Sequence, residues 1–266
     1  MPRQVAAFSN STVKLLRSLR DKKARRAEGL FLAEGLRILT ESRDSGQLPE
    51  IIAFSPEGAK HPLAAEIIAA TEAAGGDAIE TSADILSKMS GKDNPQMLLG
   101  AYRQPEVSLE RIDRSKADLW IVAQALRDPG NIGTILRTGD AVGAGGLILV
   151  DDSADPYSVE AVRASMGAIF TQAVASARWP EFLGWLRSGE GQLAGTSLQA
   201  TRDYLEAEYR QPCFLLIGNE QQGLPADYEA ECDLLVKIPM AGRADSLNAA
   251  VAAAVMAFCV KASWRN

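Results

Sequence analysis

Three segments rich in glycine and polar residues stand where the sequence is best suited to chemistry. They span residues 128–139, 218–224 and 238–248, and each comes soon after a predicted strand in the second half of the chain. Ligands of open α/β sheets bind beyond the carboxyl ends of the strands, so side chains in these segments are candidate ligands. None of the segments has the lysine of a phosphate-binding P-loop or the GxGxxG spacing of a dinucleotide-binding turn.

The first segment has two interpretations. It can be a capped helix in which Asn131 is the N-cap and the Arg137 side chain is solvated. Alternatively, Gly133 and Gly139 are present because they allow the close approach of another backbone or a ligand. Each glycine inside a helix costs about 1 kcal/mol relative to alanine, which favours a specific reason for their presence.

The other two segments are also ambiguous when taken singly. Residues 218–224 can be an ordinary turn before a helix whose first residue is Pro225, and Ser246 can be a helix cap. Asn248 opens a helix that is apolar all round, so we expect its amide to be buried and hydrogen-bonded. The recurrence of such a segment after three strands favours a binding site over three unrelated turns.

Few residues are available for other kinds of chemistry. The single histidine, His61, lies in a polar loop before Pro62, so Ser-His and Cys-His hydrolysis and a multi-histidine metal site are not expected. The three cysteines have no CxxC spacing and are expected to be buried and reduced. No metal site is predicted.

The elements that position the three segments form an alternating α/β pattern from residue 119 onward. Several predicted strands are apolar on both faces, which is typical of a parallel sheet covered by helices on both sides. We predict strands over residues 119–123, 146–150, 192–194, 214–217 and 234–238. Helices are predicted over 132–142, 159–170, 180–187, 226–231 and 247–260.

A smaller α/β unit is predicted to precede this one. It contains helices over residues 9–28, 36–41, 63–74 and 83–89, and strands over 30–33, 51–54 and 97–102. Residues 103–118 are polar and include a proline, as expected of a connection. We therefore expect a first domain over 1–103, a linker over 104–118 and a second domain over 119–266.

Charge is distributed unevenly between the two parts. Residues 1–37 carry a net charge of +6, whereas the whole chain carries −6, so the remainder is strongly acidic. Such a cluster suits contact with RNA phosphates, but a solvated helix face explains it equally well on charge alone. The N-terminus lacks the apolar core of a signal peptide, and the longest apolar run, 249–260, is too short to cross a membrane. A cytoplasmic protein without membrane contact is expected.

Together the three segments resemble the signature motifs of the SpoU family of RNA ribose 2′-O-methyltransferases, in the SPOUT superfamily. The matching runs are DPGNIGTILRT, IGNEQQGL and IPMAGRADSLNAAVA, in the order of that family. The runs NSTVKLLRSLRDKKARRAEGLFLAEGLRIL and MSGKDNPQMLLGAY resemble the N-terminal RNA-binding domain of its ribosomal-RNA members. Two local departures are Ala249-Ala250, where many members have bulkier residues, and Met97, where the family usually has glycine.

The resemblance implies a C-terminal α/β domain with a parallel sheet and a deep trefoil knot, working as a homodimer. It implies S-adenosylmethionine as methyl donor and no metal. The positions that would bind the donor are Thr196, Gly218, Ile238, Met240 and Leu247.

The resemblance also assigns catalytic positions: Arg137 at the centre, with Asn131, Glu220, Ser246 and Asn248 around it. A ribose hydroxyl is a poor nucleophile, so the site must help remove its proton or stabilise the developing alkoxide. Arginine remains protonated and is unsuited to act as a base. We therefore expect Arg137 to orient the nucleotide and stabilise negative charge, held by Glu220 through a charge-assisted bond.

The resemblance favours 23S-type ribosomal RNA as substrate because of the extra N-terminal domain. The alternative is transfer RNA, on which members with short extensions act. Two rival functions are an RNA-binding protein that has lost catalysis, which the intact polar positions disfavour, and a nicotinamide-dependent enzyme, which the missing glycine spacing disfavours.

Overall fold

The computed structural model describes residues 2–219 and 221–265, which form two compact units. The first unit runs up to Pro105 and includes Tyr157–Phe170. The second contains Glu106–Pro156 and the chain from Thr171 onward.

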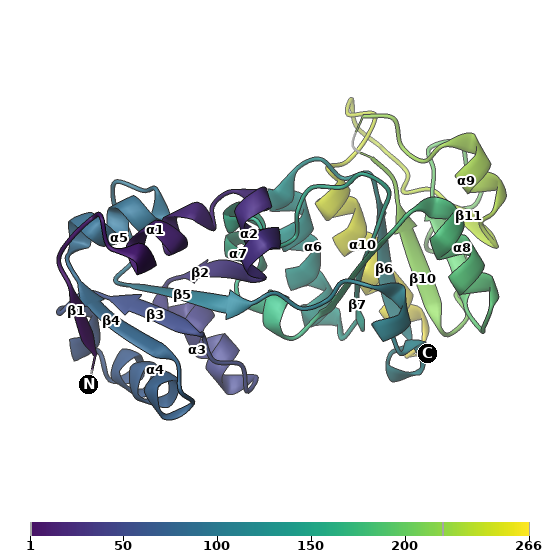
Figure 1. Cartoon of the computed structure of the whole chain (residues 1–266). Helices are drawn as coiled ribbons and strands as arrows, with labels where there is room; N and C mark the ends of the chain where they lie inside the picture. The colour runs from purple at the N-terminus through teal and green to yellow at the C-terminus, as the bar shows by residue number, and fades with distance from the viewer. Residues whose placement is uncertain (1, 220, 266) are drawn as a thin grey trace. The chain divides into compact units, whose positions relative to one another are not determined.

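The first unit is built on a mixed five-stranded sheet (Figure 1). Its strands, in spatial order, are β1 (Arg3–Val5), β4 (Asp77–Thr81), β3 (Ile51–Phe54), β5 (Leu98–Arg103) and β2 (Leu30–Glu34). The first three are parallel, and β5 is antiparallel to both of its neighbours. The helices of this unit are α1 (Ser11–Ser18), α2 (Lys22–Glu28), α3 (Leu36–Asp44), α4 (Pro62–Ala73) and α5 (Ala83–Ser90).

The basic segment near the N-terminus forms two helices rather than the single one predicted over 9–28. Asp21 caps α2, because its carboxylate accepts the backbone N–H groups of Lys23 and Ala24. The buried Arg25 guanidinium donates to the carbonyl oxygens of Leu19 (2.9 Å) and Arg20 (2.8 Å). These bonds satisfy carbonyl groups after the end of α1 and fix the corner between the two helices.

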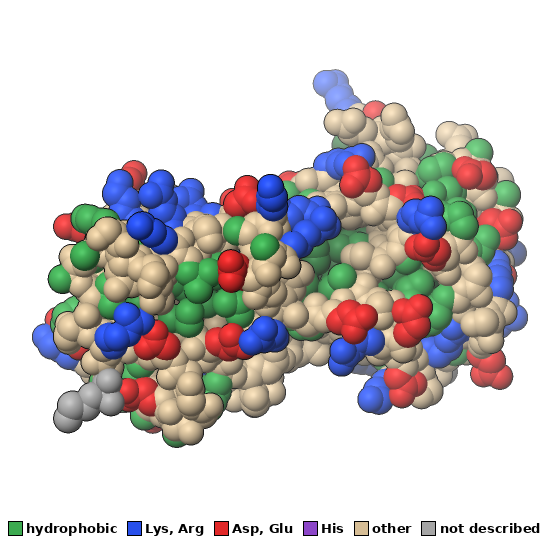
Figure 2. Space-filling model, viewed as in Figure 1, with side chains coloured by type: hydrophobic (Ala, Val, Ile, Leu, Met, Phe, Trp, Pro, Cys, Tyr) green, Lys and Arg blue, Asp and Glu red, His purple; other side chains and the backbone are tan. Residues whose placement is uncertain are grey.

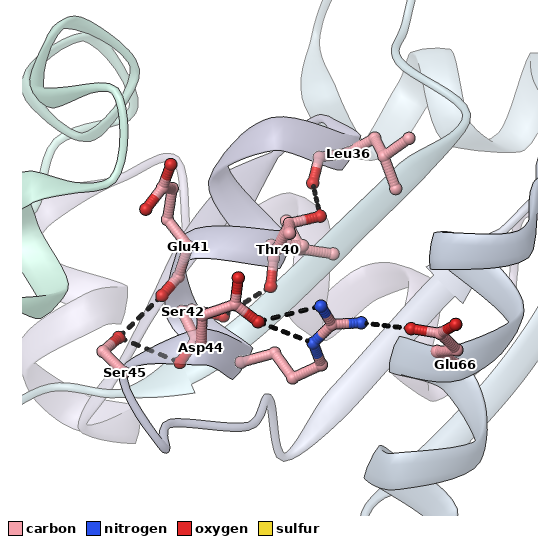
Figure 3. A network of polar contacts seen from close by, with 9 residues as sticks. Leu36, Thr40, Glu41, Ser42, Asp44, Ser45 and Glu66 are labelled. Atoms are coloured by element: carbon pink, nitrogen blue, oxygen red, sulfur yellow. Dashed lines mark hydrogen bonds and ion pairs between the residues drawn. The ribbon is translucent and has the colours of Figure 1, made fainter.

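Helix α3 is tied to its neighbours by polar contacts (Figure 3). The Arg43 guanidinium donates to Asp44 (2.8 Å) and, across to α4, to Glu66 (2.7 Å). Beneath it, the hydroxyl groups of Ser42 and Tyr102 lie 2.7 Å apart in the core. These contacts fix α3 against the sheet and against α4.

Residues 157–170 pack with the first unit, although the sequence places them in the second domain. The ring of Phe170 lies 4.7 Å from that of Tyr102 and 5.8 Å from that of Phe31, between centroids. Tyr157 covers Phe31 at 5.0 Å. The expected division at residue 119 differs from the observed one because these aromatic contacts are long-range. The predicted helix over 159–170 is also broken, into α7 (Val159–Ser165) and η4 (Ala168–Phe170).

The second unit is built on a six-stranded sheet in which every pairing is parallel. In spatial order its strands are β11 (Leu234–Val236), β9 (Gln192–Thr196), β10 (Cys213–Ile217), β6 (Leu119–Gln124), β7 (Gly146–Val150) and β8 (Ala173–Ala177). Five of them agree with the predicted strands to within a few residues. Strand β8, like β1 and β4 in the first unit, was not predicted.

Helices cover both faces of this sheet, as its apolar strands require. On one face, Trp120, Phe214 and Leu216 pack against α8 (Trp179–Arg187). On the other face, α6 (Pro129–Val142) lies beside α10 (Ala249–Ser263), and both contact the central strands (Figure 1). The remaining helix, α9 (Ala226–Ala230), follows β10.

The expected linker is an integral part of the second unit. Leu109 and Ile112 are buried in the same hydrophobic cluster as α8. Around them are two 3-10 turns, η2 (Leu109–Arg111) and η3 (Arg114–Lys116). The Arg114 guanidinium lies 4.1 Å from the centre of the Trp185 ring and donates to the Leu186 carbonyl (3.0 Å) at the end of α8. Because the segment is polar in composition, its sequence did not indicate these contacts.

The C-terminal helix is less buried than its apolar sequence suggests. Val251 and Phe258 are 48% and 56% exposed, whereas the intervening Ala253, Met256 and Ala257 face the core. Among the described residues, no helix has the length and apolar character needed to span a membrane.

Candidate functional site

A cavity of about 460 Å³ lies in the second unit, where β9, β10 and β11 end. Its wall comes from three stretches of chain: residues 196–199, 217–229 and 238–252. Because the three strands are parallel, the loops that follow them emerge at one edge of the sheet. The cavity lining includes all five positions that the resemblance assigns to the methyl donor: Thr196, Gly218, Ile238, Met240 and Leu247.

Close backbone packing shapes the loop that follows β10. A Cβ atom on Gly218 would lie 2.5 Å from the carbonyl carbon of Gly223 and 2.6 Å from the nitrogen of Leu224. No real side chain tolerates such a distance from backbone atoms, so the return of the chain at Gly223 depends on glycine at 218.

Asn219 holds this loop to a neighbouring one, which the sequence analysis did not foresee. Its amide donates to the Ala125 carbonyl (2.9 Å), and its side-chain oxygen accepts the backbone N–H of Gln221 (2.8 Å). Ala125 follows β6 and has a left-handed φ of 48°, an unfavourable conformation for a residue with a Cβ. A signal was present in the sequence, since an asparagine directly after a strand-ending glycine is suited to such turns.

Asn131 and Asn248 meet although they are far apart in sequence. The Asn248 amide donates to the Asn131 side-chain oxygen at 3.0 Å. Its own oxygen caps α10 by accepting the N–H groups of Ala250 (2.9 Å) and Val251 (3.3 Å). The expectation of pairing is therefore correct, but that of burial is wrong: Asn248 is exposed because it belongs to the exposed loop that precedes the buried first residues of α10. The expected cap of α6 is also different, since Asp128 rather than Asn131 accepts the N–H of Gly130.

Of the remaining expected catalytic residues that the structure describes, Ser246 lines the cavity and Arg137 does not. Ser246 lies in the cavity wall, with its hydroxyl 3.4 Å from the Asp245 carboxylate. Arg137 is exposed on α6 and is not among the described residues that line the cavity. A helix rises about 1.5 Å per residue, so Arg137 lies roughly 9 Å along α6 from Asn131. Glu220 lies outside the described residues.

Helix α9 is anchored on the side away from the cavity. The Tyr228 hydroxyl donates to the Asp151 carboxylate (2.7 Å), and its ring stacks on Trp179 with centroids 3.9 Å apart. The other Asp151 oxygen accepts the backbone N–H of Trp179 (3.0 Å). Burial, with the neighbouring Asp151 carboxylate, raises the pKa of the Tyr228 hydroxyl. Two other residues of α9, Ala226 and Glu229, line the cavity.

The described residues of the second unit do not favour a cysteine nucleophile or a metal centre. Burial raises the pKa values of the Cys213 and Cys232 thiols to about 12, so neither is a thiolate nucleophile at neutral pH. No group of three His, Cys, Asp or Glu side chains suited to a metal ion occurs within residues 2–219 and 221–265. The cavity instead offers apolar walls, backbone groups and a few polar side chains, as binding sites for small organic ligands do.

Two family models match different parts of the chain. Residues 118–258, more than half of the chain, match the model of the SpoU rRNA Methylase family. The chain belongs to the SpoU rRNA methylase family. Residues 10–100 match a second model, the MRM3-like substrate binding domain, so this SpoU member carries a separate substrate-binding module.

Similarity to other SpoU members extends over the whole chain. It is 29% identical to the 23S rRNA (guanosine(2553)-2′-O)-methyltransferase RlmP of Bacillus subtilis (strain 168), over 96% of this chain and 98% of that protein. It is 31% identical to the 23S rRNA (uridine(2479)-2′-O)-methyltransferase of Streptomyces viridochromogenes, over 90% and 84%. The AdoMet-bound rRNA methyltransferase from Sinorhizobium meliloti superposes with a TM-score of 0.90 at 37% identity, covering 98% of this chain and 97% of that one.

Replacing Asn248 tests whether its two hydrogen-bonding roles are separable. Asn248→Asp keeps an oxygen to cap α10 but sets a carboxylate against the Asn131 oxygen, so we expect a loss of about 1 kcal/mol in unfolding free energy. Asn248→Ala also removes the cap, which costs about 0.5–2 kcal/mol more. Chemical denaturation measures both, with Asn94→Asp in an exposed loop as control. Wild-type stability of Asn248→Asp would show that the contact with Asn131 contributes nothing.

Proposed function

We propose that this chain transfers a methyl group from S-adenosylmethionine to a ribose 2′-hydroxyl of 23S-type ribosomal RNA. The observation that carries the proposal is the cavity, whose wall includes two of the three segments that resemble the SpoU motifs, residues 218–224 and 238–248. The Sinorhizobium meliloti relative with AdoMet bound supports the donor. The two 23S rRNA methyltransferases among the relatives, both similar over most of their length, support the substrate.

The cavity fits the donor in size and in chemistry. Its volume of about 460 Å³ lies within the roughly 300–1,000 Å³ typical of small-molecule sites. Ile217, Ile238 and Leu247 supply apolar wall on which an adenine ring can lie. Polar edges of the ligand would meet backbone groups of the loops after β10 and β11. Bound there, S-adenosylmethionine supplies an electrophilic methyl group on a sulfonium sulfur.

Arg137 is proposed to orient the target nucleotide and stabilise negative charge on its oxygen. Its guanidinium remains protonated, and so it acts through charge and hydrogen bonds. We propose that Glu220 holds this guanidinium, and that Asn131, Asn248 and Ser246 border the nucleotide. The Asn131–Asn248 bond supports the grouping, because it joins α6, which carries Arg137, to the segment that lines the cavity.

A homodimer is proposed to complete the site. Arg137 is exposed and lies outside the cavity lining of its own chain, so a second copy would bring it to a cavity. Helix α10, which packs beside α6, exposes Val251 and Phe258. These residues are seven positions apart and so lie on one face of the helix. Covering this apolar face with the same face of another copy would give a symmetric interface.

Ribosomal RNA is proposed to contact the first unit through α1 and the corner that follows it. Lys14, Arg17 and Arg20 border an open hollow together with Ser18 and Asp21. Figure 2 shows Lys and Arg side chains gathered over this part of the molecule. Phosphate contacts of this kind position RNA without reading its sequence.

The trefoil knot is proposed from the path of the last 30 residues. Lys237, after β11, exchanges backbone hydrogen bonds with Arg202 (3.0 Å) and Tyr204 (3.1 Å). Further on, the Trp264 indole donates to the Tyr209 carbonyl at 2.7 Å. The start of α10 meanwhile contacts Asn131 on α6. The C-terminal segment thus lies between residues 202–209 and α6, as threading through that loop would require.

Methyl transfer is tested directly with labelled donor. Purified protein with labelled S-adenosylmethionine and unmodified 23S rRNA should place label on one ribose 2′-oxygen, found by nucleotide mapping. Arg137→Ala should lower turnover at least about 100-fold, the usual effect of losing one transition-state contact, and leave donor affinity unchanged. Arg210→Ala, an exposed arginine elsewhere, is the control. Label on transfer RNA alone would overturn the substrate; full turnover by Arg137→Ala would overturn its role.

Neutralising the α1 cations tests the RNA-binding surface. The double variant Lys14→Ala/Arg17→Ala should weaken rRNA binding and reduce the salt slope of log affinity by about 1–2, since each phosphate contact contributes roughly one unit. Lys60→Ala, which removes an exposed cation on another element of the first unit, is the control. Filter binding at several salt concentrations measures both. An unchanged slope in the double variant would remove α1 from the RNA contact.

Placing a charge on the exposed face of α10 tests the dimer. We expect Phe258→Asp to convert a dimeric wild type into monomers in sedimentation velocity, because the interface would bury an unpaired carboxylate. Leu205→Asp, another highly exposed apolar residue, should leave the dimer intact. A wild-type protein that sediments as a monomer at all concentrations would contradict the assignment.

A further inference from the structure

The cavity wall carries charge of one sign. Among the described lining residues, those with charged side chains are Glu229 and Asp245, and both are carboxylates. Two nearby cations, Lys237 and Arg243, flank the same loops but are not among these lining residues. The site thus presents negative charge to whatever it binds.

Glu229 is held in place by its own helix. Ala226 and Glu229 are three residues apart, and so share the face of α9 that lines the cavity. Tyr228, between them, is fixed on the other side by the Asp151 carboxylate and the Trp179 ring. Asp151 is itself held by the first N–H of α8. This anchor limits the rotation of α9 and keeps Glu229 in the cavity wall.

The proposed reaction changes the charge of the ligand by one unit. A bond forms between the ribose oxygen and the methyl carbon, the electron pair of the broken S–C bond stays on sulfur, and the hydroxyl proton passes to solvent. The sulfonium cation becomes the neutral thioether of S-adenosylhomocysteine. Apart from the methyl group, donor and product have the same groups, so charge is the main property by which a site can distinguish them.

We propose that Glu229, together with Asp245, makes the cavity select the cationic donor over the neutral product. The inference rests on the proposed function, since it takes S-adenosylmethionine as the ligand. Glu229 is only partly exposed, so its carboxylate attracts a cation more strongly than a fully solvated one would, and Asp245 adds charge of the same sign at the surface. Product loses this attraction when the methyl group leaves, and is therefore released in favour of fresh donor.

The same charges have a distinct kinetic signature. Their attraction acts on the bound donor, and it weakens as the sulfonium charge disperses during transfer. Removing a carboxylate should therefore raise the KM for the donor without lowering kcat. A purely structural loss in the cavity would instead lower kcat as well.

Calorimetric titration of the full-length protein tests the inference with three ligands: S-adenosylmethionine, S-adenosylhomocysteine and sinefungin, in which a charged amine replaces the methylated sulfonium. Glu229→Gln should weaken the two cationic ligands about three- to tenfold, as expected for one charge contact near a protein surface, and leave the neutral one unchanged. Asp227→Asn removes the same charge from α9 at an exposed position outside the described cavity lining, and should change none of them.

Several outcomes would overturn the inference. Equal weakening of all three ligands in Glu229→Gln would mean that the residue contributes shape or hydrogen bonding rather than charge. Unchanged affinities in both Glu229→Gln and Asp245→Asn would also overturn it; the second variant is at an exposed loop position and is expected to fold. If the wild type binds none of the ligands, the proposed function itself fails. If it binds them without preferring the cations, only the selectivity fails.

Discussion

The parallel direction of the strands in the second sheet is the constraint on which the rest of the site depends. Leu215 of β10 pairs with Ala194 of β9 on one side and with Ile121 of β6 on the other, all running in the same direction. The loops that follow these strands must then leave at one edge. The stretches that follow β9, β10 and β11 are thereby brought around a single cavity, which no local feature of the chain would achieve.

Loops at such an edge are useful only if their shapes are fixed. Asn219 ties the loop after β10 to the one after β6, Tyr228 ties α9 to the end of β7, and Asn248 ties the start of α10 to α6. Each of these bonds joins segments distant in sequence. Together they hold the cavity wall in place before any ligand arrives, which reduces the conformational entropy lost on binding.

The two units differ in the charge that they present to their ligands. The cations of the first unit are concentrated on α1, α2 and the corner that buried Arg25 holds, where they suit a polyanion. The second unit is acidic, and the two charged residues among those described in its cavity wall, Glu229 and Asp245, are both acidic, which suits a sulfonium ligand. A uniformly basic protein would attract RNA equally well but would hold the cationic donor less tightly. Separate units allow both preferences in one chain.

The sequence by itself determined the parallel sheet, because strands such as residues 146–150 are apolar on both faces, and it located two of the three stretches of chain that line the cavity. It also identified the family from the three segments that resemble its motifs. It did not predict β1, β4 or β8, whose sequences, RQV, DAIET and AVASA, contain few large apolar residues and so give no clear strand pattern. Tertiary structure alone decided that residues 157–170 pack with the first unit, that Tyr228 anchors α9 and that Glu229 lines the cavity. These outcomes depend on contacts between residues far apart in the chain, and local propensity contains no information about them.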